Sequence, residues 1–299
     1  MQNIEQERYS WTKLLAVLIF IFIYGLLNVV GGSKDIALNM DDQNTINLLK
    51  ILQVASVVLI FIVPAVLFAI YSTKQGISYL GVSTRPLLKT LLIGGIGMLL
   101  AMPLINWLAE INQHMHLPAS FSAIETWMRN SEDKATEFTQ AFTKGTSIST
   151  LILNLFVMAF MAALSEELFF RGILQKLLIE CFKNKHVGVW IGAILFSAFH
   201  MQFYGFLPRM LMGAYLGYLF VWSGSIWPSI FAHFLNNAIA VYVVWLVNRG
   251  VVSMDVDKVG ADQQQWLLVL ISAIIVIFSL VLIYRTEKKN NVQPLDELN

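Results

Sequence analysis

Long apolar runs, separated by short polar connections, make up most of this 299-residue chain. A helix that crosses a membrane needs about 20 predominantly apolar residues. On that basis the chain predicts about eight transmembrane helices, at residues 11–31, 48–71, 88–109, 149–180, 187–204, 207–222, 225–247 and 265–284. The expected fold class is therefore all-α: a polytopic membrane protein with a single membrane domain over residues 1–299.

The lengths and spacing of these runs constrain the helical bundle. The fourth run is longer than a bilayer requires, so we expect this helix to tilt or to protrude. The fifth, sixth and seventh runs are joined by very short connections and should be antiparallel neighbours. Glycines four residues apart, Gly188 with Gly192 and Gly213 with Gly217, predict that helices approach closely there.

Residues 110–148 form the only sizeable piece of chain that is not predicted to span the membrane. Apolar residues such as Trp127 and Phe138 alternate there with charged residues such as Arg129 and Glu132. This mixture predicts an interfacial amphipathic helix or an extramembrane, solvated loop. We detect no internal repeat, so nothing favours an inverted-repeat transporter.

The composition agrees with a membrane protein and excludes other classes. The chain is 57% hydrophobic and 13% charged, whereas about a quarter of the residues of a soluble domain are charged. A net charge of +1 without a long basic stripe argues against nucleic acid as a partner. The single cysteine, Cys181, excludes an internal disulfide. The solvent partner is therefore membrane lipid.

Lysine and arginine residues near the ends of the spans indicate an orientation. They are slightly more numerous in the short connections on the side that holds both termini, so we expect both termini in the cytoplasm. The first apolar run is too long for a signal-peptide core and is expected to be retained. Short tails and the lack of a transit sequence fit a bacterial plasma membrane.

Charged residues interrupt the fourth apolar run, in the sequence Ser165-Glu166-Glu167-Leu168-Phe169-Phe170-Arg171. One charge at bilayer depth costs at least about 2.5–3.5 kcal/mol, so several together need protein partners or a wet cavity. Glu167 and Arg171 are four residues apart and are expected to form an ion pair on one helix face. Glu166 is rotated about 100° from Glu167, which leaves its carboxylate free for chemistry.

Polar residues in two later runs lie at a matching depth. The fifth run ends in Phe196-Ser197-Ala198-Phe199-His200, and the seventh contains His233-Phe234-Leu235-Asn236-Asn237. At 1.5 Å per residue, Glu166, His200 and Asn237 lie about 18–21 Å from span ends on the same side of the membrane. His233 lies about 12 Å from its span end. Residues 149–247 are therefore predicted to be catalytic core helices.

These side chains could hydrolyse an amide with an activated water. Glu166 could take a proton from a water that His200 helps to hold. His233 and Asn237 could stabilise the oxyanion that forms on the carbonyl. Ser165 and Ser197 border the motifs, but neither lies in a G-x-S-x-G elbow, so a serine nucleophile is disfavoured.

Two alternatives remain open from the residues alone. Glu166, His200 and His233 match the ligand count of a catalytic zinc site, although the contiguous H-E-x-x-H signature is absent. Zinc and the absence of any cofactor are both compatible with the pattern. The same polar layer could also serve a non-catalytic transporter or a bacteriocin-immunity protein, because intramembrane Glu and His residues also act as proton relays.

The ordered motifs E-E-x-x-x-R, F-x-x-x-H and H-x-x-x-N resemble those of the CPBP family of intramembrane proteases. These are the CAAX prenyl endopeptidases and the bacteriocin-processing or Abi-type proteins. The matching residues are Glu166, Glu167 and Arg171; Phe196 and His200; and His233 and Asn237.

The resemblance implies a CAAX-endopeptidase-like helical core that hydrolyses peptide bonds of a peptide or lipidated protein, by metallo- or glutamate-type chemistry. It assigns water activation to Glu166 and His200, and oxyanion stabilisation to His233 and Asn237. Glu167 and Arg171 form a structural pair in that family.

Overall fold

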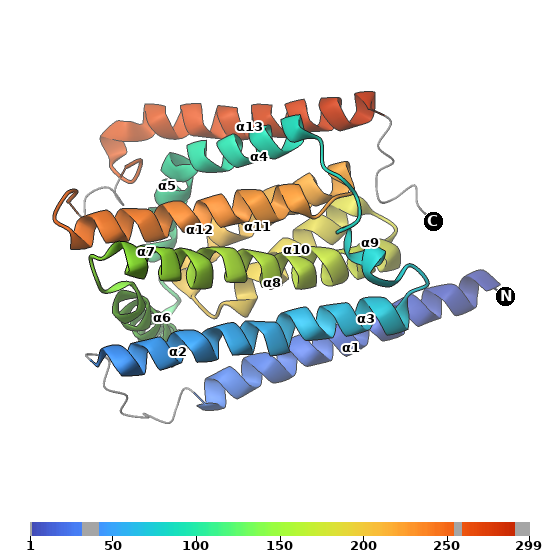
Figure 1. The fold of residues 1–299 in the computed structure, drawn as a ribbon, viewed down its shortest axis with the longest axis horizontal. Helices are drawn as coiled ribbons and strands as arrows, with labels where there is room; N and C mark the ends of the chain where they lie inside the picture. Colours follow the sequence, from blue (N-terminus) through green and yellow to red (C-terminus); the bar gives the residue numbers. More distant parts are fainter. Residues whose placement is uncertain (1, 32–41, 254–258, 291–299) are drawn as a thin grey trace.

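The computed structural model describes residues 2–31, 42–253 and 259–290. Within these ranges every regular element is helical, and no strand is present. Figure 1 shows long helices that run nearly parallel to one another, as a bundle of membrane helices requires. The expected all-α class is confirmed.

Four helical stretches among the described residues are long and apolar enough to cross a membrane. The first is Gln43–Ser72, built from α2 (Gln43–Val57), the π-helical segment η1 (Val58–Ile62) and α3 (Val63–Ser72). The second is Ile148–Phe182, 35 residues long, and corresponds to the predicted fourth span. The others are α12 (Trp227–Asn248) and α13 (Trp266–Lys289).

The third predicted span is broken into two helices. α4 (Leu88–Leu100) and α5 (Met102–Gln113) meet at an angle of 45° around Ala101. Pro103 lies just after this break, and proline both lacks an amide N–H and clashes with the preceding helical turn. Counted as one span, the pair raises the number of candidate spans in the described chain to five.

The remaining predicted spans are shorter or less apolar than a full crossing. They fall in α1 (Gln2–Gly31), of which the part with described side chains, Ser10–Gly25, counts as a shorter apolar helix, in α10 (Lys185–Phe199) and in α11 (Phe206–Ser223). α10 ends five residues before the predicted boundary at 204, because His200 caps it and Met201 adopts a left-handed φ of 55°. The count of eight transmembrane helices is therefore not confirmed.

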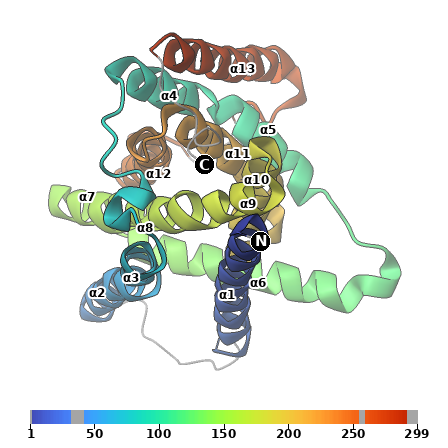
Figure 2. The same ribbon diagram turned by 90° about the vertical axis from the view of Figure 1, so that its right-hand side faces the viewer.

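The stretch Ile148–Phe182 occupies the middle of the bundle (Figure 1). α1, α2 and α3 lie on one side of it, and α4, α12 and α13 lie on the other. α6 (Ser122–Thr143) crosses the ends of these helices at a steep angle, as Figure 2 shows. Much of the predicted connection 110–148 is thus a helix, with its orientation suited to a membrane surface.

Aromatic rings fill the interior next to the predicted site. Phe170 packs edge-to-face on Phe196 at 5.1 Å and on Phe199 at 5.5 Å between ring centroids. Phe61 of η1 packs on Phe169 in the same way at 5.5 Å. Such pairs add about 0.5–1.5 kcal/mol each beyond their area burial. They fix the acidic stretch against α10 and against the Gln43–Ser72 helix.

The paired glycines lie where helices approach one another. A Cβ at Gly213 of α11 would lie 3.3 Å from the Cα of Ala193 in α10. A Cβ at Gly188 of α10 would lie 2.4 Å from Cγ1 and 3.0 Å from the backbone nitrogen of Ile179, in α9 (Lys176–Phe182). Small residues at these positions therefore permit backbone contact, as their spacing predicted.

We predict that Gly188→Ala destabilises the protein by about 1–3 kcal/mol, because the added methyl group collides with backbone atoms that cannot move aside. Thermal unfolding of the purified protein in detergent measures this change. Gly192→Ala, one turn away, is the control, since its methyl group would meet its nearest atoms at 3.7 Å. Equal unfolding midpoints for the two variants would contradict the prediction.

Candidate active site

The two glutamates of the acidic motif lie on a short α-helix between two π-helical segments. α8 (Ala162–Phe169) follows η4 (Leu155–Met161) and precedes η5 (Phe170–Gln175). π-helical turns inside longer helices are rare and frequently occur at functional sites. Here they bracket Glu166 and Glu167.

Glu167 forms the predicted ion pair with Arg171. The guanidinium Nη1 lies 2.6 Å from Oε1 of Glu167, and the two side chains are 2% and 0% exposed. Arg171 also donates from Nη2 to the carbonyl of Gly213 at 3.1 Å. Its guanidinium lies 4.4 Å from the ring centroid of Phe196, a favourable cation–π distance. The guanidinium is therefore held by protein groups, whereas Oε2 of Glu167 is buried without a hydrogen-bond partner.

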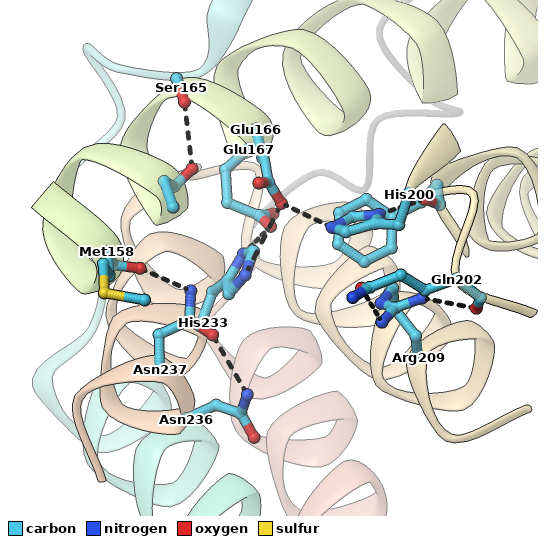
Figure 3. Close-up of polar contacts among 12 residues, drawn as sticks. Met158, Ser165, Glu166, Glu167, His200, Gln202, Arg209, His233, Asn236 and Asn237 are labelled. Atoms are coloured by element: carbon cyan, nitrogen blue, oxygen red, sulfur yellow. Dashed lines mark hydrogen bonds and ion pairs between the residues drawn. The ribbon is translucent and has the colours of Figure 1, made fainter. Parts of the chain in front are cut away.

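His233 of α12 contacts both glutamates, as Figure 3 shows. Its Nδ1 lies 2.8 Å from Oε1 of Glu167, and its Nε2 lies 3.8 Å from Oε2 of Glu166. A carboxylate paired with Arg171 accepts hydrogen bonds, so Nδ1 of His233 carries the proton. The neutral imidazole then presents the lone pair of Nε2 to Glu166.

His200 lies on the other side of Glu166, at the end of α10 (Figure 3). Its Nδ1 donates to the carbonyl of Phe196 at 2.9 Å, because a carbonyl can only accept. Its Nε2 lies 3.7 Å from Oε2 of Glu166. Phe196, one turn earlier, thus supports both Arg171 through its ring and His200 through its backbone.

Glu166 is the least constrained member of this cluster. Its side chain is 19% exposed, and its Oε2 is buried without a hydrogen-bond partner. The distances of 3.7 and 3.8 Å to the two imidazoles exceed hydrogen-bond length. Polar groups at such separations can be bridged by one water molecule. The structure therefore brings Glu166, His200 and His233 together around one point.

Asn237 lies one helical turn after His233 and faces η4. Its Nδ2 is 3.5 Å from the carbonyl oxygen of Met158, and its Oδ1 accepts a hydrogen bond of 3.2 Å from Asn236. A bond of 3.5 Å is weak, and the amide nitrogen carries a second N–H. Asn237 is thus anchored beside the site and retains donor capacity.

The two serines that border the motifs are hydrogen-bonded to backbone. Ser165 donates to the carbonyl of Ala162 at 3.1 Å, and Ser197 donates to that of Phe206 at 2.8 Å. Both residues are buried. Both hydroxyls are thus engaged by backbone carbonyls.

A metal site gains no support from the described residues. No group of three or more His, Cys, Asp or Glu side chains in this part of the chain is arranged to hold a metal ion. Glu166, His200 and His233, the predicted ligands, meet at the distances given above without forming such a group.

Three polar residues near the site, Arg209, Gln202 and Asn112, were not identified from the sequence. Arg209 of α11 lies close enough to Glu166 and His200 to act on both electrostatically. It donates to Oε1 of Gln202 at 2.8 Å and to the backbone carbonyl of the same residue at 3.2 Å (Figure 3). The available signal was its position, nine residues after His200 and close to the start of the next apolar run.

The third such residue is Asn112 of α5, which holds the connection between His200 and Arg209. Asn112 is buried, donates to the carbonyl of Phe203 at 3.0 Å and accepts from the amide of Leu207 at 2.8 Å. These bonds fix both ends of the turn that follows His200. No sequence pattern links residue 112 to this turn, because 91 positions separate it from Phe203.

The fold and the site define a class: an integral membrane protein with a carboxylate between two imidazoles inside a helical bundle. Residues 148–239 match the family described as type II CAAX prenyl endopeptidase Rce1-like. This segment contains all three motifs. This match, which covers residues 148–239 alone, supports a relationship of this segment to the CPBP family of intramembrane proteases.

One curated relative has no described function. The chain is 26% identical over 92 residues to the uncharacterized protein YpbD of Bacillus subtilis (strain 168), which covers 29% of this chain. The match spans 44% of the length of that relative. No solved structure matches the chain significantly. The family implies a protease in general and leaves the substrate and the type of chemistry to be proposed.

We predict that Arg171→Ala destabilises the protein by about 3–5 kcal/mol, because it leaves the Glu167 carboxylate buried without its counter-charge. Thermal unfolding and the yield of monodisperse protein measure the effect. Arg85→Ala, at an exposed position, is the control. The double variant Glu167→Gln/Arg171→Met should recover part of the stability, since it buries no charge. A stable Arg171→Ala variant would show that the pair contributes little.

Proposed function

We propose that the chain is an intramembrane endopeptidase that cleaves a peptide bond of a membrane-associated peptide or lipidated protein with a water activated by Glu166. The observation that carries this proposal is the position of Glu166 Oε2, which has no hydrogen-bond partner and faces Nε2 of His200 and of His233. A carboxylate in this setting can act as a general base.

In the first step a water molecule binds between Glu166 and His200. His200 accepts one hydrogen bond from the water through Nε2, since its Nδ1–H is held by the Phe196 carbonyl. Glu166 takes the other proton as the water oxygen attacks the carbonyl carbon of the substrate. The product of this step is a tetrahedral intermediate with a negatively charged oxygen, and the proton resides on Glu166.

Donors on α12 stabilise the developing oxyanion. Asn237 contributes the N–H that its contact with Met158 leaves free. His233 can donate from Nε2 only in its doubly protonated form, because Glu167 holds the proton on Nδ1. Glu166 then transfers its proton to the amine nitrogen as the carbon–nitrogen bond breaks. The reaction releases a carboxylic acid and an amine, and the side chains return to their initial state.

Nothing in the structure favours the non-catalytic alternatives. A transporter or an immunity protein would need neither a carboxylate without a hydrogen bond between two imidazoles nor the complete set of protease motifs. We place the protein in a bacterial plasma membrane with both termini in the cytoplasm. The first described end of α1 and the last described end of α13 lie at the same end of the bundle (Figure 1), as this orientation requires.

The proposal is tested by incubation of the purified full chain, in detergent or nanodiscs, with membrane peptides that do or do not carry a prenylated cysteine. Glu166→Ala and Glu166→Gln should slow product formation by about 10²–10⁴-fold, the contribution of a general base. Glu137→Gln, at an exposed position of α6, is the control and should cleave normally. Equal turnover by the native protein and the Glu166 variants would show that Glu166 is not the general base. Zinc measured in the same samples, and lost in His200→Ala, would support ligation.

Asn237→Ala should lower kcat by about 100-fold or more and leave the unfolding midpoint nearly unchanged, since oxyanion donors act mainly in the transition state. Asn236→Ala is the matched control, because it removes the same side-chain amide at the adjacent position. Asn236 donates only to Oδ1 of Asn237 and leaves the free N–H of Asn237 in place, so turnover should change less. Steady-state kinetics with any cleaved peptide makes the comparison. An unchanged rate for Asn237→Ala would assign this residue to packing against η4.

A further inference from the structure

Arg209, in the first turn of α11, is a cation beside the candidate active site that forms no ion pair with the described residues. Glu132 of α6 and Glu166 act on it electrostatically, from beyond contact distance. It differs in this from Arg171, which is buried and paired with Glu167. Arg209 is also partly exposed. A charge in an apolar bundle needs partners, so this guanidinium retains the capacity to bind an anion.

The guanidinium of Arg209 is held in place with most of its donors unused. Gln202 accepts two hydrogen bonds from it, through Oε1 at 2.8 Å from Nη2 and through the backbone carbonyl at 3.2 Å from Nη1. A guanidinium has five N–H groups, so these two bonds leave the others available. A Cβ at Gly205 would lie 3.1 Å from Nη2. The glycine at this position therefore leaves one side of the guanidinium uncovered.

The accessible part of the candidate active site lies on the side of Arg209. The side chains of His200 and Glu166 are 25% and 19% exposed, whereas that of His233 is 3% exposed. Figure 3 places Arg209 beside His200, and Asn237 beyond His233. A peptide that reaches Glu166 through this accessible side would therefore lie against the guanidinium.

A carboxylate is the peptide group that fits such a guanidinium. The planar fork of arginine matches the two oxygens of a carboxylate and binds them by two parallel hydrogen bonds. These bonds are stronger in an apolar interior than in water. In a peptide the carboxylate is either an Asp or Glu side chain or the end of the chain, and its chemistry toward Arg209 is the same.

We propose that Arg209 binds a carboxylate of the peptide substrate, within a few residues of the bond that is cleaved, and thereby restricts cleavage to peptides that carry one there. This inference rests on the proposed function, because it names the substrate that the same site accepts. Gln202 positions the guanidinium from the turn that follows His200. One turn thus places both the group that binds the carboxylate and the imidazole that holds the water.

The test is the binding of one fluorescent apolar peptide, followed by anisotropy, to the full chain in nanodiscs. Glu166→Gln is the background, so that the peptide is not consumed, and empty nanodiscs correct for partition into lipid. The peptide is made with a free or an amidated C-terminus, each with Asp or Asn close to that end. A form with a carboxylate should bind about 10-fold or more tightly than the amidated Asn form, as expected of charge-assisted hydrogen bonds.

Comparison of the two forms with a single carboxylate distinguishes a side chain from a chain end. Arg209→Gln, added to the background, should abolish the preference, and Arg209→Lys should retain part of it, since it keeps the charge without the fork. Gln202→Glu should also abolish it, because it places a carboxylate against Nη2 with little change in size. This variant keeps Arg209, so its result does not depend on the folding of Arg209→Gln.

Arg285→Gln is the matched control, because Arg285 is an exposed arginine of α13. It should retain the full preference. Equal binding of all peptide forms, or a preference that survives Arg209→Gln, would overturn the inference and leave the proposed hydrolysis intact. A native chain that cleaves none of the peptides but binds them with the Arg209-dependent preference would overturn the hydrolysis and support the carboxylate site.

Discussion

The pairing of Glu167 with Arg171 inside the hydrocarbon region is the interaction on which the arrangement of the core depends. Two charges that water cannot reach must be neutralised and hydrogen-bonded by protein groups. Arg171 donates a hydrogen bond to the carbonyl of Gly213 and lies over the ring face of Phe196. Glu167 accepts a hydrogen bond from Nδ1 of His233. The pair thereby joins the central helix to α10, α11 and α12.

The same contacts set the protonation of the site. Because Glu167 accepts from Nδ1 of His233 and the Phe196 carbonyl accepts from Nδ1 of His200, both rings direct Nε2 at Glu166. Phe196 contributes its ring to one contact and its backbone to the other. The groups that contact the buried pair are therefore also those that orient the imidazoles. Oε2 of Glu166, which faces both rings, is left without a hydrogen-bond partner, as is Oε2 of Glu167.

The spacing of residues along single helices predicted some of these features but not others. The ion pair follows from a separation of four residues on a helix, and the close approach of α10 and α11 follows from their paired glycines. The end of α10 at Phe199 was not predicted, because the apolar run continues into the turn that follows. The contribution of Asn112 was missed because its partners, Phe203 and Leu207, are distant in the sequence.

By itself, the sequence determined that the chain is helical, that it belongs in a membrane, and that a few polar residues enter an apolar interior at similar depth. These properties follow from hydropathy, helical periodicity and the cost of charge in hydrocarbon, which act locally along the chain. Only the tertiary structure decided that α6 crosses the ends of the bundle and which nitrogen of each imidazole faces Glu166. Those outcomes depend on contacts between residues far apart in the chain, such as Glu167 with His233, and periodicity within a single helix carries no information about them.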